Sequence, residues 1–392
     1  MIGRIFVARA LRSFADGFIS VVLPAYLLAL GLGQLEVGVV GTSTLLGSAC
    51  MTLAVGRWGH RFPIRRLMLA AAVLMAATGL AFAGASSFWP LMLVAFFGTL
   101  NPSSGDASVF MPLDHTMLAT AADRTSVFAR YSFIGSMAGA LGALISGLPE
   151  WLGSHVAMLG ALRFMFLLYA LVGVAVWFLY LQLPEARAEE ERPPVPLGPS
   201  KGIVVRLAAL FSVDSFAGGL VLNSLLALWL FQRYGMTLGA AGAFFFWTGL
   251  LSACSQLVAG PLARRIGMVN TMVFTHIPSS LFLIGAALAS RLDLVLACLL
   301  ARSLLSQMDV PARGAFVMSV VTSAERPAAA SFTSVPRSLA SAISPSITGA
   351  AFAAGAMAAP LVACGVLKIA YDIALFAAFR RAESKPLASS GA

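Results

Sequence analysis

The chain has 392 residues, of which 59% are hydrophobic and only 11% are charged, and its mean hydropathy is +0.89. A soluble domain carries about a quarter charged residues, so this composition excludes a large soluble domain. Most of the protein surface must therefore face lipid. With roughly 20 apolar residues per membrane span, the length allows about a dozen helices.

Apolar runs broken by glycine, proline and charge predict six membrane spans before a polar segment and six after it. The predicted spans are 5–30, 36–55, 67–85, 88–112, 126–148, 157–181, 203–231, 238–260, 268–289, 292–317, 328–353 and 357–379. The polar segment, PEARAEEERPPVPLGPSK, is rich in proline and glutamate and predicts an exposed linker. We expect an all-helical membrane protein with bundles at 1–183 and 203–381, a linker at 184–202 and a tail at 382–392.

The net charge of +10 is concentrated in a few connecting segments. The clustered bases are Arg57, Arg61, Arg65 and Arg66, then Arg187, Arg192, Lys201 and Arg206, then Arg264 and Arg265, and finally Arg380, Arg381 and Lys385. The alternate loops hold only Arg233 and Arg291. This is the positive-inside pattern, and it predicts cytoplasmic termini and a cytoplasmic linker in a multi-pass protein of the bacterial inner membrane. It disfavours nucleic acid as a partner.

The chain offers no residue pattern for metal, cofactor or enzyme chemistry. Its cysteines, Cys50, Cys254, Cys298 and Cys364, are isolated in apolar segments, so neither a zinc site nor a disulfide framework is predicted. A nucleophile elbow, a phosphate-binding loop and a dinucleotide fingerprint are also missing. We therefore expect no enzyme and no intrinsic ATP drive. This leaves an ion gradient, with H⁺ as the expected coupling ion, or facilitated diffusion.

The two halves of the sequence repeat each other. Asp16-Gly-Phe18 matches Asp214-Ser-Phe216 at an offset of 198, and LLGSAC ending at Cys50 matches GLLSAC ending at Cys254 at an offset of 204. Small drifts in offset are what changes in loop length produce. The pattern indicates an internal duplication of six-helix units. Two parallel repeats with a site at their interface are the architecture of one large class of transporters.

The loop GRWGHRFPIRR, residues 56–66, resembles the basic loop signature G-x-x-x-D-R-x-G-R-R of the major facilitator superfamily. Gly56, Arg61, Arg65 and Arg66 match it, while His60 replaces the acid and Pro63 replaces a glycine. The later copy, GPLARRIGMVN, keeps Gly260, Arg265 and Gly267, with Arg264 in place of the acid. The resemblance covers nearly the whole chain and implies alternating access between two six-helix bundles, with these loops as a cytoplasmic latch. The alternative is that the arginines only signal topology.

The fifth span, GSMAGALGALISG, resembles the Gly-Pro-rich motif of superfamily members that export by antiport, with Ala140 where proline is expected. Its counterpart in the eleventh span, SLASAISPSITG, supplies Pro345 and Gly349. The resemblance implies export of a drug or metabolite in exchange for H⁺. The alternative is close helix packing through small residues at four-residue spacing.

Ionisable side chains near the bilayer centre cost at least ~2.5–3.5 kcal/mol each, so they tend to face a cavity or a partner. The embedded acids, Asp16, Asp106, Asp214 and Asp309, fall on the four spans that line the central cavity in the resembled fold. A cavity carboxylate can exchange a proton, so we predict these residues for proton coupling. The alternative is structural: Arg12 can neutralise Asp16 four residues later, and Asp106 and Asp309 can hold Arg130 or Arg313.

We predict that substrate contacts come from six polar residues: Arg12, Asn101, Asn223, Arg302, Gln307 and Arg337. An arginine at mid-depth can clamp a carboxylate or phosphate with two hydrogen bonds, or it can be the standing partner of Asp309. We expect Lys368 to be neutralised by Asp372, one turn away.

Three hypotheses follow. The first is a monomeric, lipid-embedded, proton-coupled exporter of a small organic solute. The second is an organic-anion transporter that uses Arg302 and Arg337. The third is a non-transporting membrane sensor or lipid-handling protein on the same fold.

Overall fold

The computed structural model describes residues 2–103, 108–118, 124–153, 155–185, 197–322 and 325–380, and the regular secondary structure in these ranges is helical. Two compact units are present. Unit 1 comprises Met1–Glu190, Val221–Leu250 and Ala342–Met357, and unit 2 comprises Glu191–Leu220, Leu251–Ser341 and Ala358–Ala392. The predicted proton-coupling residue Asp106, the middle of the predicted linker and the predicted tail lie outside the described residues.

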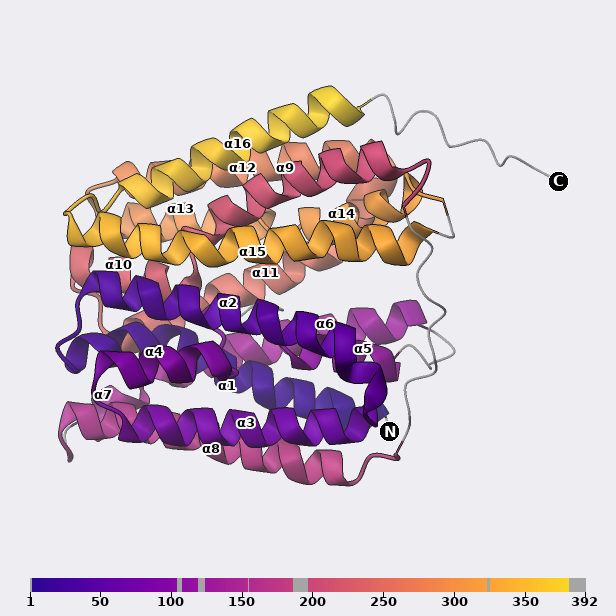
Figure 1. The fold of residues 1–392 in the computed structure, drawn as a ribbon. Helices are drawn as coiled ribbons and strands as arrows, with labels where there is room; N and C mark the ends of the chain where they lie inside the picture. Colours follow the sequence, from indigo (N-terminus) through magenta and orange to yellow (C-terminus); the bar gives the residue numbers. More distant parts are fainter. Residues whose placement is uncertain are drawn as a thin grey trace. The chain divides into compact units, whose positions relative to one another are not determined.

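The helices follow the predicted spans in order (Figure 1). The first half of the chain forms α1 (Ile2–Ala29), α2 (Gln34–Trp58), α3 (Ile64–Gly84), α4 (Phe88–Phe97), α5 (Phe110–Leu118), α6 (Arg124–Leu144), α7 (Leu148–Leu152) and α8 (Met158–Leu181). The second half forms α9 (Lys201–Gly219), α10 (Asn223–Tyr234), α11 (Leu238–Ile266), α12 (Met268–Leu288), α13 (Leu292–Leu305), α14 (Asp309–Ser319), α15 (Arg326–Ala353) and α16 (Ala359–Phe379).

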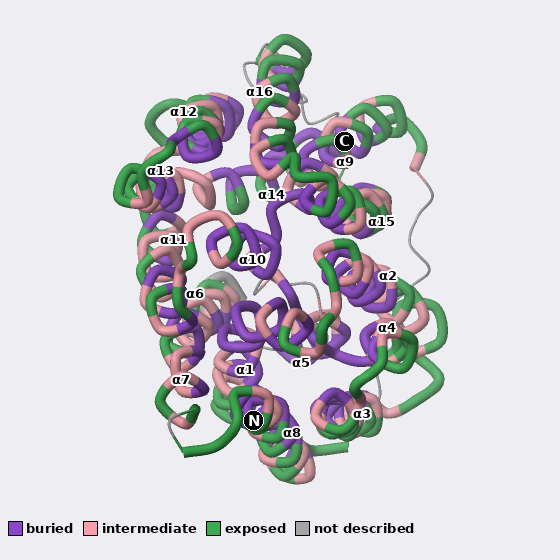
Figure 2. Tube along the Cα trace, turned by 90° about the vertical axis from the view of Figure 1, so that its left-hand side faces the viewer, coloured by how far each residue is buried: buried purple, intermediate pink, exposed green. Residues whose placement is uncertain are grey.

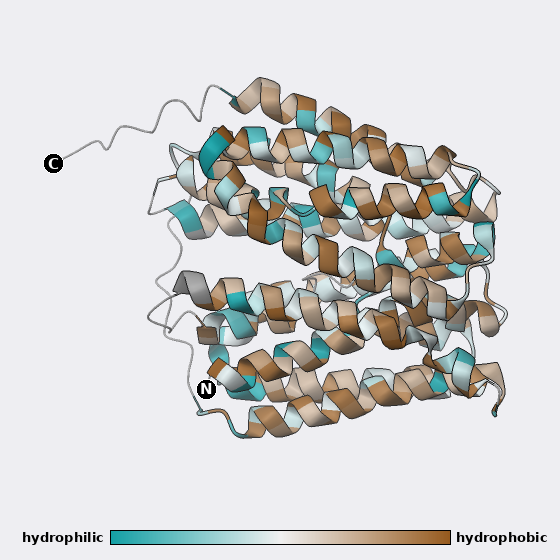
Figure 3. Ribbon diagram, turned by 180° about the vertical axis from the view of Figure 1, so that it is seen from behind, coloured by the Kyte–Doolittle hydropathy of each residue, from teal (hydrophilic) through white to brown (hydrophobic). Residues whose placement is uncertain are grey.

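Within the described ranges, nine helical segments are long and apolar enough to cross a membrane. Large apolar side chains lie on the outside of the units, for example Trp89, Leu171 and Leu257, each more than 60% exposed. Apolar residues also run along most of each helix (Figure 3). Water would not tolerate such a surface, whereas hydrocarbon does. The chain is therefore an integral, multi-pass membrane protein.

Three predicted spans are interrupted. The fourth divides into α4 and α5, the seventh into α9 and α10, and the tenth into α13 and α14. Three predicted substrate residues lie at these breaks. Asn101 lies between α4 and α5, Gln307 lies between α13 and α14, and Asn223 is the first residue of α10. The side-chain oxygen of Asn101 accepts hydrogen bonds from the N–H and hydroxyl of Ser103, at 3.1 and 2.7 Å. Backbone freed from a helix at membrane depth needs such partners inside the protein.

Unit 1 is built around α1, which packs against α6 and α8, with α3 beside α8 (Figure 1). α1 is buried along most of its length (Figure 2). A Cβ added to Gly142 would lie 1.9 Å from the carbonyl oxygen of Phe14, and one added to Gly17 would lie 2.1 Å from that of Gly139. Any side chain there would separate α1 from α6. Close helix packing therefore accounts for Gly142 of the fifth span.

Segments from the second half of the sequence complete unit 1. The Thr42 hydroxyl on α2 lies 2.7 Å from the Ser346 hydroxyl on α15, and a Cβ on Gly38 would lie 2.4 Å from the Pro345 carbonyl oxygen. The Glu150 carboxylate on α7 accepts the N–H groups of Leu238 and Gly239. Because these N–H groups open α11 and have no partner within the helix, a carboxylate is well suited to bind them.

Unit 2 has an apolar core shared by α9, α12, α14 and α16. Buried aromatic side chains at its centre include Phe211, Phe316 and Phe379. α12 packs against α13, α14 and α16, and α9 packs against α16. Gly267 has a φ of 94°, which lets the chain turn between α11 and α12 without the steric conflict that a Cβ would bring. The helices that carry the embedded charges are thereby held side by side.

Glu325 connects the described end of the predicted linker to the loop before α15. Its carboxylate accepts hydrogen bonds from the Gly198 N–H, from the Ser200 hydroxyl at 2.6 Å and from the Thr322 hydroxyl at 2.7 Å. These hydrogen bonds favour the ionised form and lower the pKa of Glu325 from its ordinary 4.5 to about 2. The ionised carboxylate therefore stabilises this junction.

We expect Glu325→Gln to lower the melting temperature of the purified protein at neutral pH by several degrees. Because the folded-state pKa lies below the unfolded one, the stabilisation is complete above pH 4.5 and is lost as the pH falls toward about 2. The difference in melting temperature between wild type and variant should therefore become smaller as the pH is lowered, in melting curves recorded in detergent. Glu185→Gln, at an exposed ion pair, is the control. A difference in melting temperature that stays constant with pH would contradict the role of the ionised Glu325.

Candidate functional site

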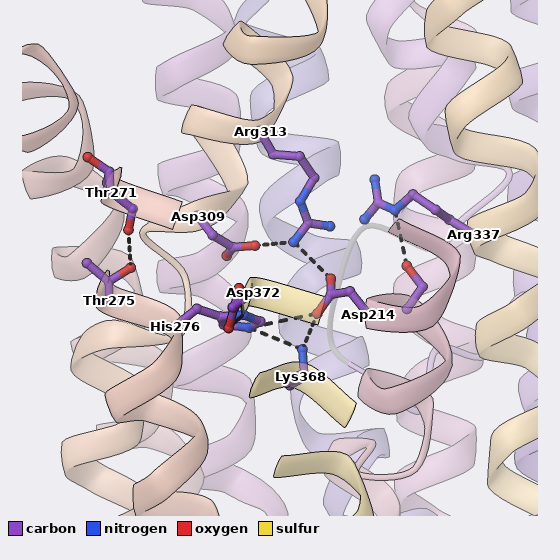
Figure 4. A network of polar contacts seen from close by, with 10 residues as sticks. Asp214, Thr271, Thr275, His276, Asp309, Arg313, Arg337, Lys368 and Asp372 are labelled. Atoms are coloured by element: carbon purple, nitrogen blue, oxygen red, sulfur yellow. Dashed lines mark hydrogen bonds and ion pairs between the residues drawn. The ribbon is translucent and has the colours of Figure 1, made fainter. Parts of the chain in front are cut away.

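The carboxylate of Asp214 on α9 is the centre of a polar cluster in unit 2 (Figure 4). Lys368 Nζ on α16 lies 2.6 Å from its Oδ1, and Arg313 Nη2 on α14 lies 2.9 Å from its Oδ2. The Asp214 side chain is only 5% exposed. One carboxylate therefore joins three helices that are far apart in the sequence.

Two further side chains extend the cluster. Asp309, one turn before Arg313 on α14, forms an ion pair with it, which confirms the interpretation that Asp309 holds this arginine. Arg337 on α15 donates a hydrogen bond from Nε to the Ser215 hydroxyl at 3.1 Å, and its guanidinium carbon lies 5.9 Å from the Phe211 ring centroid. Arg337 forms no ion pair within the described residues.

His276 on α12 completes the cluster, and the sequence analysis did not select it. Its Nδ1 lies 3.0 and 3.1 Å from the two carboxylate oxygens of Asp372. Its Nε2 lies 3.2 Å from Lys368 Nζ and 3.8 Å from Asp214 Oδ1. The expectation that Asp372 neutralises Lys368 is wrong, because Lys368 reaches across to Asp214 while Asp372 faces the histidine.

Unit 1 contains a second buried ion pair. Arg12 on α1 binds Asp114 on α5 and donates to the Tyr180 hydroxyl on α8. The Tyr131 hydroxyl donates to the same carboxylate at 2.6 Å, and the Phe110 ring centroid lies 4.3 Å from the Arg12 guanidinium carbon. The predicted substrate residue Arg12 is thus engaged by a partner that the sequence analysis did not consider. Asp114 was missed because the predicted fourth span ended at residue 112.

Asp16 on α1 is half-buried and lies within electrostatic reach of Tyr169 on α8. The Tyr169 hydroxyl is 3.0 Å from both the hydroxyl and the carbonyl oxygen of Thr99. Asp16 and Asp214, which match in the sequence repeat, therefore lie in different surroundings. Asp214 meets two cations and a histidine, and Tyr169 is a neighbour of Asp16.

Arg302 on α13 differs from the other embedded bases. It has no hydrogen-bond or ion-pair partner for its side chain among the described residues, and Cys364 on α16 is the group that acts on it electrostatically. The idea that Arg302 is the standing partner of Asp309 is wrong, because Arg313 occupies that place. A half-buried, unpaired guanidinium in a membrane span is available to an anion.

The predicted gate loops lie at helix ends. Arg65 donates to the carbonyl oxygen of Leu181 at the end of α8, at 2.6 Å, and Arg66 makes an exposed ion pair with Glu185 at 3.4 Å. Gly56 and Arg61 lie at the end of α2 and in the turn after it, and Gly260 and Arg265 lie in the last part of α11. Among the described residues, no group of three or more potential ligands is placed to hold a metal ion.

Comparisons with known proteins agree with this architecture. The family model described as Major Facilitator Superfamily matches residues 5–306. The chain is 24% identical, over 384 residues, to the uncharacterized membrane protein YJR124C of Saccharomyces cerevisiae, covering 86% of this chain and 85% of that protein.

Solved structures of transporters share the fold. The nucleoside transporter NupG superimposes with a TM-score of 0.74 at 13% identity, over 97% of this chain and 99% of that one. A bacterial homolog of the human lysosomal transporter Spinster gives 0.73 at 15% identity, over 100% and 98%. The human organic anion transporter MFSD10 gives 0.66 at 17% identity, over 95% and 98%. At these identities the likeness establishes the fold alone.

Removing one partner of the Arg12–Asp114 pair should leave a buried, uncompensated charge. We expect Arg12→Met and Asp114→Leu each to cost about 3–5 kcal/mol in the free energy of unfolding. The double variant should be closer to wild type than either single one, because neither charge is left alone. Denaturant titrations in mixed micelles would measure this. Arg66→Ala, at the exposed pair, should cost less than about 1 kcal/mol, and equal losses at both sites would refute the prediction.

Proposed function

Because the chain belongs to the major facilitator superfamily, we propose that it is a secondary active transporter that exports a small organic solute in exchange for protons. The observation that supports proton coupling is the Asp214 carboxylate, held at once by Lys368 and Arg313 in the interior of unit 2. It is an ionisable group at membrane depth on which helix packing depends.

Protonation of this cluster has a direct mechanical consequence. The ionised Asp214 attracts Lys368 on α16 and Arg313 on α14, and a positive charge gained by a neighbouring group of the cluster competes with them for this carboxylate. A proton therefore weakens the contacts among α9, α14 and α16, and its release restores them. A bound proton can drive a conformational change only if it interacts differently with the two states. The Asp214 contacts supply that difference.

The remaining parts of the proposal rest on sequence features. The arginine clusters at 57–66 and 264–265 favour cytoplasmic placement of these loops and of both termini, as in a bacterial inner-membrane protein. The export direction rests on the resemblance of the fifth span to the antiporter motif. We propose a monomer whose partners are its solute and lipid, with no nucleic acid and no cofactor besides the proton gradient.

The test is transport by purified protein in liposomes that contain a pH-sensitive dye and carry an imposed pH gradient. Ethidium, benzoate and a neutral sugar serve as probes, and proton flux that depends on the solute is recorded. We expect Asp214→Asn to abolish gradient-driven transport. The double variant Asp214→Asn/Lys368→Met, which restores the charge balance of the cluster, should still exchange solute without any dependence on the gradient.

Asp293→Asn is the matched control, because Asp293 is an exposed acid on α13 paired with Arg291. It should leave the gradient dependence unchanged. Wild-type transport that persists when a protonophore collapses the gradient would refute proton coupling. Gradient-driven transport by a well-folded Asp214→Asn variant would refute the role of this carboxylate.

A second candidate function is transport of an organic anion. The observation that favours it is the unpaired guanidinium of Arg302, since every carboxylate of the unit 2 cluster already has a partner. An arginine can bind a carboxylate or phosphate through two parallel hydrogen bonds. Arg337 is the weaker candidate because Ser215 and Phe211 already contact it.

For this candidate we expect Arg302→Ala to weaken the apparent affinity for benzoate at least about tenfold, since a hydrogen bond to a charged group contributes roughly 1.5–3 kcal/mol. Arg337→Ala should have a smaller effect. Competition by benzoate and by a phosphorylated sugar in the same liposomes measures the affinities. The exposed Arg291→Ala is the control. Unchanged benzoate affinity in Arg302→Ala, or equal loss for ethidium, would exclude an anion site at this residue.

A further inference from the structure

The contacts of His276 define which of its nitrogens carries a proton. Lys368 has an ammonium group, which can donate hydrogen bonds but cannot accept them. Its Nζ lies 3.2 Å from His276 Nε2, so Nε2 must present its lone pair. Nδ1 then carries the hydrogen and donates it to the Asp372 carboxylate at 3.0 Å. The structure thus corresponds to a neutral histidine with its proton on Nδ1.

We infer that His276 is the residue that binds the coupling proton, and that protonation of its Nε2 displaces Lys368 from Asp214. A proton from water forms a bond with the Nε2 lone pair, and the Nδ1–H bond to Asp372 stays in place. The hydrogen bond from Lys368 is lost, because two cationic groups 3.2 Å apart repel each other. Asp214 Oδ1, which lies 3.8 Å from Nε2 and thus beyond hydrogen-bond distance, is the carboxylate oxygen that attracts the new cation.

The charges around His276 show why Lys368 is the group that moves. The ionisable groups near it are Asp214 on α9, Asp309 and Arg313 on α14, Arg337 on α15, and Lys368, Tyr371 and Asp372 on α16. With a neutral histidine, the three carboxylates balance Arg313, Lys368 and Arg337. An imidazolium adds one positive charge. Arg313 is held by two carboxylates and Lys368 by only one, so Lys368 is released first.

The displacement of Lys368 has a consequence for α16 that can be observed without any solute. Cys364, one turn before Lys368 on the same helix, is fully buried. When the Lys368–Asp214 contact opens, α16 loses its ion pair with α9 and keeps only the apolar packing, so we expect this thiol to become more accessible. The inference rests on the proposed proton coupling for its role in transport, whereas the proton switch itself is tested independently of transport.

The experiment uses the full chain in membranes, with Cys50, Cys254 and Cys298 replaced by alanine so that Cys364 is the only thiol. Its labelling by N-ethylmaleimide is measured from about pH 5 to about pH 8, the range in which histidine titrates. The rate at each pH is divided by the rate in the same protein with His276→Gln. We expect this ratio to rise several-fold as the pH falls. Lys368→Met should be labelled rapidly across the whole range.

His276→Asn provides a second variant, because its amide can still donate to Asp372 but has no titratable nitrogen. Size-exclusion profiles verify that the variants fold. Parallel pH profiles in wild type and both histidine variants would overturn the inference. A pH response that requires His276, in a protein whose transport ignores the pH gradient, would support the switch and refute only the proposed proton coupling.

Discussion

A charged side chain at membrane depth is more stable beside an opposite charge, and buried ion pairs set the inner arrangement of both units. In unit 1 Arg12 on α1 meets Asp114 on α5, and in unit 2 Asp214 on α9 meets Arg313 on α14. In each half of the sequence, the pair joins the first helix to the second segment of the fourth span of that half, which is α5 in the first half and α14 in the second. The breaks in these spans are therefore matched by electrostatic contacts that hold the shorter segments in place.

The two pairs have opposite polarity. The first helix carries the cation in unit 1 and the acid in unit 2, although the same elements are joined. A second difference concerns the repeated acids. Tyr169 on α8 lies near Asp16, whereas Lys368 on α16 lies against Asp214. A phenol is neutral and an ammonium is charged, so the two matched positions differ in these neighbours. The attraction between Asp214 and its cationic partners depends on the ionisation of its carboxylate.

Much of the fold was predictable from the sequence, because membrane spans are read from apolar runs and each predicted run contains helix in its described residues. The matched aspartates were also recognisable, and Asp214 does lie in a buried cluster. The interruptions were missed, because the apolar run from α9 to α10 was taken as one span although Gly218-Gly219, a turn signal, lies at the end of α9. Asp114 was hidden by the resulting boundary error. His276 was overlooked because a single histidine forms no recognisable sequence pattern. Only the folded structure places Lys368 and Asp372 beside its two nitrogens.

The local pairs show why sequence spacing alone is insufficient. Asp309–Arg313 and Lys368–Asp372 have the same four-residue spacing, yet only the first pair is formed. Arg313 has several donors and can keep its local acid while it binds Asp214. Lys368 has a compact charge on a flexible side chain. Its ammonium group therefore binds the carboxylate of Asp214 on α9 and not that of Asp372 on its own helix. In a buried cluster the charges on all surrounding helices therefore decide each contact, and a histidine that gains a proton can redistribute them.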